Sequence, residues 1–129
     1  MVTPQEAWML QARTWKEAQL EAEVHHLATA LGWRWYHPPR AVKEKVTAGF
    51  PDDTLVKPPR LVFAELKQEG AYPTPAQRDW HSDLIACGIE VHVWRPYDYL
   101  SGRIRACLMG VPYQEPLPTS GRDRGLTRR

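Results

Sequence analysis

The 129-residue sequence predicts a single α/β domain in which helices flank a central β-sheet. Three observations support this prediction. Residues 61–67 begin with apolar side chains on both faces, which is typical of a central strand covered on both sides. Helical patterns precede and follow this strand at residues 14–31 and 75–87. Short aromatic or β-branched segments, bounded by proline and glycine, predict further strands.

The predicted elements follow one another in the order α-β-β-β-α-β-α. They are a helix at residues 14–31, strands at 33–37, 53–56 and 61–67, a helix at 75–87, a strand at 89–94 and a helix at 97–108. Gly32 ends the first helix, and Pro58 with Pro59 forms a hairpin turn because proline cannot donate to a strand ladder. Thr74 and Pro75 begin the second helix, with proline at its favoured first position.

These elements define one domain at residues 14–108, with an N-terminal extension at 1–13 and a basic, flexible tail at 109–129. The net charge is +2, and residues 110–129 carry all of it, with four arginines against two acids. No apolar run approaches the roughly 20 residues that a membrane helix needs, and the first residues lack a signal-peptide pattern. We therefore expect a cytoplasmic protein without a membrane partner.

The two cysteines, Cys87 and Cys107, lie far apart and match no metal-ligand spacing such as C-x-x-C. In a reducing compartment we expect free thiols that pack as small apolar core residues. The five histidines show no metal-ligand spacing either. We expect His25 and His26 at the surface, and His37 either packed at the end of its strand or facing a site.

Glu65 and Lys67 end the predicted central strand and share one of its faces, because side chains alternate along a strand. Asp52 enters the preceding strand of the hairpin, so it can approach Glu65. Two neighbouring carboxylates repel each other unless a cation or a raised pKa relieves them, and oxygen ligands suit Mg²⁺ or Mn²⁺. The alternatives are a structural Glu65–Lys67 ion pair and ordinary turn acids at Asp52 and Asp53.

Two further polar residues occupy inward-facing positions on the predicted helices. At about 100° per residue, Glu17 falls inside the apolar stripe of the first helix, where an acid needs a partner. Either a metal site lies beneath this first turn, or the helix end frays and Glu17 reaches water. Gln77 follows Thr74 at capping-box spacing, so it could cap its helix and also hold an acid or a phosphate.

Residues 34–60 carry six basic side chains against three acids, a local charge of +3 beside the predicted carboxylates. A site that holds a cation and a phosphate backbone would explain this charge, and so would a solvated loop. Arg40, Lys43 and Lys45 are the candidate nucleic-acid-binding residues, which would hold the backbone without reading sequence.

Five ordered blocks carry a resemblance to a known family. They are LGW with YH within residues 31–37, GFPD at 49–52, FAELK at 63–67, TPAQRDW at 74–80 and GIEVHVWRP at 88–96. Together, over roughly residues 14–108, they resemble the VRR-NUC domain, the virus-type replication-repair nuclease branch of the PD-(D/E)XK superfamily. The resemblance implies a restriction-endonuclease-like fold, with a mixed central sheet flanked by helices, and Mg²⁺-dependent hydrolysis of DNA.

The resemblance also implies a role for each matching residue. Asp52, Glu65 and Glu17 would be the metal-ligand acids, Lys67 the catalytic lysine, and Gln77 the glutamine of the following helix. Mn²⁺ could substitute for Mg²⁺.

Two positions depart from the family pattern. Asp53 stands where the family usually has an apolar residue, so it either takes part in the site or points away on the other strand face. Glu21 stands where a glutamine is common.

Stand-alone members of this family resemble dimeric Holliday-junction resolvases of viruses, and fused members act on flaps. By analogy we expect an endonuclease of replication, recombination or repair that selects branched DNA, in a bacterial or phage-infected cell. A homodimer would suit a symmetric junction, with Trp8, Trp15 and residues 97–108 as candidate interface elements. The alternatives are a catalytically inactive DNA-binding module of the same fold and a purely structural domain.

Overall fold

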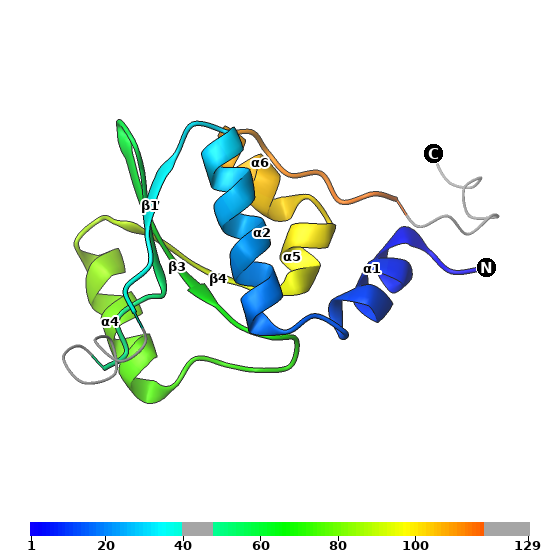
Figure 1. The fold of residues 1–129 in the computed structure, drawn as a ribbon, viewed down its shortest axis with the longest axis horizontal. Coiled ribbons are helices and arrows are strands. Elements are labelled where there is room, and N and C mark those ends of the chain that lie inside the picture. Colours follow the sequence, from blue (N-terminus) through cyan, green and yellow to red (C-terminus); the bar gives the residue numbers. More distant parts are fainter. Residues whose placement is uncertain (40–47, 118–129) are drawn as a thin grey trace.

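The computed structural model describes residues 1–39 and 48–117 of the chain. A four-stranded mixed sheet forms its centre, in the order β1-β2-β3-β4 (Figure 1). The strands are β1 (Arg34–Tyr36), β2 (Asp53–Lys57), β3 (Arg60–Leu66) and β4 (Glu90–Trp94). The first three strands pair antiparallel, whereas β4 pairs parallel to β3. The hairpin expected across the two prolines is therefore confirmed, and β3 is an inner strand.

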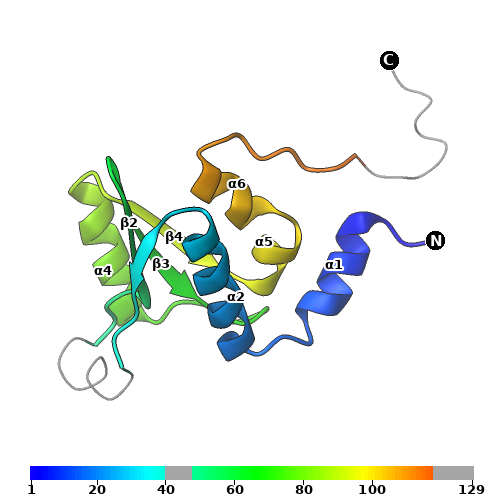
Figure 2. The ribbon, with the colours of Figure 1, turned by 45° about the horizontal axis from the view of Figure 1, so that its top comes forward.

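Five helices accompany the sheet in the described residues. They are α1 (Pro4–Ala12), α2 (Glu17–Ala30), α4 (Pro75–Ala86), α5 (Pro96–Leu100) and α6 (Arg103–Met109). Helix α4 lies against one face of the sheet, and α2, α5 and α6 lie on the other (Figure 1). Helix α1 lies beside α5, away from the sheet (Figure 2). The architecture is thus an α/β layered fold with a mixed sheet, as the sequence predicts.

The two faces of the sheet bury different side chains. On the face covered by α2, the core consists of aliphatic residues from both layers, including Leu20, Val24, Leu55, Val62, Ala64 and Leu66. On the other face, the ring of Phe63 packs edge-on against Phe50, with centroids 5.5 Å apart. Phe50 in turn meets Trp80 of α4 at 5.0 Å. Successive side chains of β3 therefore pack into cores on opposite faces of the sheet, which explains why nearly all residues of this strand are apolar.

The structure differs from the predicted elements in two places, a helix near the N-terminus and a division of the last predicted helix. Residues 1–13, expected as an extension, contain helix α1, whose capping box joins Thr3 and Glu6. The helix expected at residues 97–108 is divided at Gly102, which adopts a left-handed conformation with φ of 88°. A left-handed residue cannot continue a right-handed helix, so α6 begins in a new direction.

Two tryptophans considered as interface candidates pack within the chain. Trp15 is 7% exposed and its ring lies 5.8 Å from that of Tyr99, so it is a core residue and not an exposed contact. Trp8 meets Tyr97 edge-on at 6.2 Å and holds α1 against α5. Across residues 1–39 and 48–117, the helices are too short or too polar to cross a bilayer.

Candidate functional site

A cavity of about 340 Å³ opens at the carboxyl end of β3. All five predicted catalytic residues line it: Glu17, Asp52, Glu65, Lys67 and Gln77. Glu21 and His37 also contribute to its wall. The structure thus brings these five residues to one cavity, although they come from separate helices, strands and loops.

Asp52 is fixed immediately before β2 by a backbone contact with β3. Its carboxylate oxygen Oδ2 accepts a hydrogen bond from the amide of Leu66 at 2.8 Å, and the residue is 8% exposed. The hairpin register pairs Asp53 with Ala64, so the residue before Asp53 lies next to the end of β3. The bond from the Leu66 amide thus orients the carboxylate of Asp52 next to the end of β3.

Glu65 is 1% exposed and is held from α4. Its Oε2 accepts a hydrogen bond from Gln77 Nε2 at 2.9 Å, and its Oε1 lies 3.5 Å from His81 Nε2. Gln77 also caps its helix. Its side-chain Oε1 accepts a hydrogen bond from the backbone amide of Thr74, and its backbone amide donates to the Thr74 hydroxyl. The single side chain of Gln77 therefore fills both predicted roles. His81 is a neighbour of Glu65 that sequence reasoning missed.

Lys67 follows β3 directly, and its backbone continues the strand. Its amide donates to the carbonyl of Trp94 at 3.0 Å, which extends the parallel ladder with β4 by one residue. The alternation of side chains is preserved through this step, so Lys67 reaches the same cavity as Glu65. Lys67 therefore lines the cavity together with the predicted acids.

Glu17 begins α2 and is partly exposed at the wall of the cavity. One helical turn later, Glu21 Oε2 lies 2.6 Å from His37 Nε2. Of the two readings of Glu17, the structure favours an acid that faces the site from the first turn of the helix.

Asp53 points to the opposite face of the sheet from Asp52 and does not line the cavity. It is fully buried, and its Oδ1 accepts from His25 Nε2 at 2.8 Å and from His37 Nδ1 at 2.9 Å. His25 stacks on Trp35 with centroids 3.7 Å apart. The expectation that His25 lies at the surface is therefore wrong: its side chain is 13% exposed because it pairs with a buried acid.

Both ring nitrogens of His37 face carboxylates, since Nδ1 meets Asp53 and Nε2 meets Glu21. Only the protonated imidazolium can donate to both acids. The hydrogen bond to Asp53 is the main reason that the pKa of His37 lies above its ordinary value, and burial opposes this rise. His37 thus connects the buried acid behind the sheet to the wall of the cavity.

The raised pKa of His37 predicts a pH-dependent contribution to stability. The folded state binds the proton more tightly than the unfolded state, so the contribution is complete below the ordinary pKa of about 6.5. It is lost as the pH rises through the higher folded-state pKa. The difference in urea unfolding between the wild type and His37→Gln should therefore be largest below about pH 6.5 and should shrink as the pH rises above that value. A difference that grows with pH would contradict the imidazolium assignment.

The charges around the cavity favour a hard cation. Among the described residues, the cavity is lined by the carboxylates of Glu17, Glu21, Asp52 and Glu65 and by the basic side chains of Lys67 and His37. Carboxylates gathered in this way repel one another, and a divalent cation relieves that repulsion. All of these acids offer oxygen, the donor that Mg²⁺ and Mn²⁺ prefer. The donor set therefore fits Mg²⁺.

The proposed nucleic-acid contacts Arg40, Lys43 and Lys45 lie outside the described residues. No protein-family model, curated protein or solved structure matches the chain.

Proposed function

We propose that the chain is a Mg²⁺-dependent DNA endonuclease with a restriction-endonuclease-like fold, of the VRR-NUC type that its sequence resembles. The observation that carries the proposal is the convergence of Glu17, Asp52, Glu65 and Lys67 on one cavity. The mixed four-stranded sheet, with helices on both faces and the acids at the end of its inner strand, supports it.

In this proposal, Glu17, Asp52 and Glu65 hold the cation. When bound, Mg²⁺ supplies a water of lowered pKa and neutralises charge on the scissile phosphate. The amide of Leu66 orients Asp52, and the side chain of Gln77 orients Glu65, so the ligands need little rearrangement on binding.

Lys67 has a separate role in the proposed reaction. Its side chain lines the cavity together with the acids, and its ammonium would donate a hydrogen bond to the attacking water or to a phosphoryl oxygen. Negative charge increases on those oxygens during phosphodiester hydrolysis, so this bond is strongest in the transition state.

The substrate proposed is branched DNA, a Holliday junction or a flap, which a homodimer could engage symmetrically. Arg40, Lys43 and Lys45 precede the cavity-lining residues Ala48 and Gly49 in the chain. Backbone contacts from these side chains would hold the duplex irrespective of its sequence and would weaken as salt increases.

Cleavage of labelled linear, flap, splayed and four-way DNA with Mg²⁺, Mn²⁺ or EDTA tests this function. We expect metal-dependent cutting that falls by about 10²- to 10³-fold or more in Lys67→Ala and in Asp52→Asn. Lys57→Ala is the matched control, because its ammonium donates to the Leu31 carbonyl at 2.8 Å and lies outside the cavity.

Each result of this assay has a distinct meaning. Cleavage lost in both cavity variants but retained in Lys57→Ala supports the site, and the preferred substrate identifies the branched structure. DNA binding without cleavage under every metal would overturn the enzyme proposal and leave a DNA-binding module.

A further inference from the structure

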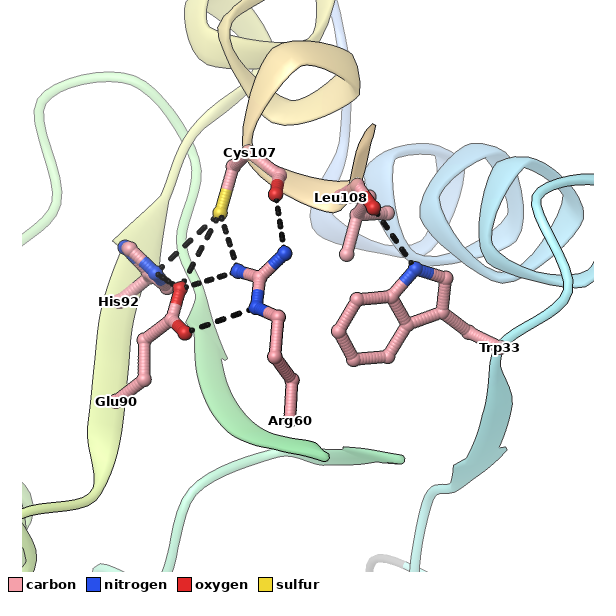
Figure 3. Close-up of polar contacts among 6 residues, drawn as sticks. All are labelled: Trp33, Arg60, Glu90, His92, Cys107 and Leu108. Atoms are coloured by element: carbon pink, nitrogen blue, oxygen red, sulfur yellow. Dashed lines mark hydrogen bonds and ion pairs between the residues drawn. The ribbon is translucent and has the colours of Figure 1, made fainter. Parts of the chain in front are cut away.

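A group of side chains that could hold a metal ion lies between β4 and α6, and none of its members lines the cavity. Glu90 and His92 share one face of β4, and Cys107 of α6 packs over them (Figure 3). In the parallel register Glu90 pairs with Val62, near the start of β3, whereas Glu65 lies near its end. This group is therefore separate from the cavity.

The three ligand atoms lie close to one another. Cys107 Sγ is 3.4 Å from His92 Nε2 and 3.5 Å from Glu90 Oε2, and these last two atoms are 2.7 Å apart. A tetrahedral Zn²⁺ with ordinary bond lengths needs its sulfur, nitrogen and oxygen ligands about 3.3–3.6 Å apart. Both distances from sulfur already meet this requirement, and the hydrogen bond between His92 and Glu90 needs to lengthen by about half an ångström.

Arg60 supports this group from the first residue of β3. Its NH2 group donates to Glu90 Oε2 at 2.7 Å, and its NH1 group donates to the Cys107 carbonyl at 2.8 Å (Figure 3). The guanidinium carbon lies 5.1 Å from the ring centre of Trp33, whose own Nε1 donates to the Leu108 carbonyl. Arg60 is thus anchored to α6 and to an aromatic ring, independently of Glu90.

The anchoring of Arg60 leaves Glu90 able to bind a metal. Arg60 NH2 contacts both Glu90 Oε2, at 2.7 Å, and Cys107 Sγ, at 3.8 Å, so an ion would have to displace this NH2 group. The guanidinium would keep Glu90 Oε1 through Nε and the Cys107 carbonyl through NH1. The side chains of Glu90 and His92 are 34% and 31% exposed, which gives an ion access from solvent. The combination of thiolate, imidazole and carboxylate is typical of zinc and unlike the oxygen-only set of the cavity.

We propose that Glu90, His92 and Cys107 form a Zn²⁺ site that ties α6 to the edge strand β4, with water as the fourth ligand. Binding releases the thiol proton to solvent, and His92 coordinates as neutral imidazole through Nε2. The site does not depend on the nuclease proposal, because it shares no residue with the cavity.

Zn²⁺ titration of the full chain, in competition with a chromophoric chelator, tests the proposal. We expect one Zn²⁺ bound per chain. In Cys107→Ser the affinity for Zn²⁺ should fall at least about 100-fold, because replacing even a residue that only orients a metal ligand lowers metal affinity by about 10- to 100-fold. Cys87→Ser is the matched control, because Cys87 is exposed and lies outside this group. Glu65→Gln and His37→Gln should keep this affinity, which separates the site from the cavity and from the cluster of His25, His37 and Asp53.

Co²⁺ binding to the wild type provides a second measurement, which does not require Cys107→Ser to fold. Wild-type protein with one equivalent of Co²⁺ should show a thiolate-to-metal charge-transfer band, and Cys87→Ser should keep it. Failure to bind Zn²⁺, binding that is unchanged in Cys107→Ser, or a Co²⁺ spectrum without the thiolate band would each overturn the proposal.

Discussion

Replacing Glu65 by glutamine should abolish Mg²⁺-dependent cleavage while the protein stays folded. The amide has the size of the carboxylate, and its oxygen can still accept the hydrogen bond from Gln77. Glu65 is 1% exposed, so its charge is held in a poorly solvated position that a neutral amide occupies at lower cost. We expect stability without metal to be equal to or greater than that of the wild type, and activity to fall by about 10³-fold or more.

Thermal unfolding with and without Mg²⁺ measures the same effect without DNA. A cation that binds only the folded state stabilises it by about 2.7 kcal/mol at 100 times its dissociation constant. The wild type should show this stabilisation, and Glu65→Gln should not. Glu69→Gln is the matched control, because Glu69 is a partly buried carboxylate near the end of β3 that accepts from the amide of Tyr97 at 2.7 Å.

Two outcomes would contradict this prediction. Cleavage by Glu65→Gln at the wild-type rate would remove Glu65 from the metal ligands. An equal loss of the Mg²⁺ effect in Glu69→Gln would show that the effect reports general surface charge and not the cavity.

The cavity residues could be predicted from sequence because each follows from a local rule. Alternation along a strand places Glu65 and Lys67 on one face, and helical periodicity places Glu17 on an inward line. The capping spacing from Thr74 identifies Gln77. Each rule needs only the residue and its neighbours. The tertiary fold adds Glu21 and His37 to the cavity wall and His81 beside Glu65, which no local rule identifies.

The two groups that combine histidine with acids or cysteine could not be predicted in this way. They are His25, His37 and Asp53, and Glu90, His92 and Cys107. His92 approaches Cys107 only because β4 pairs with β3 in a parallel register and α6 folds back over it. His25 similarly meets Asp53 through the packing of α2 on the sheet. The sequence separations follow no ligand-spacing motif, so the histidines and cysteines read as isolated residues. The expectation that both thiols are core residues is wrong for Cys87, which is exposed, and incomplete for Cys107, which is partly buried.

Helix α1 was missed for a different reason. Its apolar residues do not gather on one face, so periodicity gives little signal. The capping box between Thr3 and Glu6, with Pro4 at the first helical position, was visible in the sequence and marks the start of the helix. A capping box identifies such a helix better than periodicity does, because α1 packs through a few aromatic contacts, such as that of Trp8 with Tyr97, and not through an apolar face.

Gly49 should be the least replaceable glycine near the cavity. Its φ is +89°, and an added Cβ would lie 2.6 Å from the backbone carbonyl carbon of Ala76 in the first turn of α4. That turn is held by the capping box of Thr74 and Gln77, so it cannot move aside easily. We expect Gly49→Ala to lower the free energy of unfolding by about 2–4 kcal/mol, from left-handed strain and overpacking together.

Gly70→Ala separates these two contributions, because Gly70 has a similar φ of +84° and a Cβ there would meet no described atom within 4 Å. This control should cost only the left-handed strain, roughly 1–2 kcal/mol. Urea unfolding gives both values, and cleavage assays on the folded fraction should show a further loss in Gly49→Ala alone. That loss follows because Asp52 lies three residues beyond Gly49, so relief of the clash displaces a proposed metal ligand. Equal destabilisation by the two variants would show that the contact with α4 does not position the cavity.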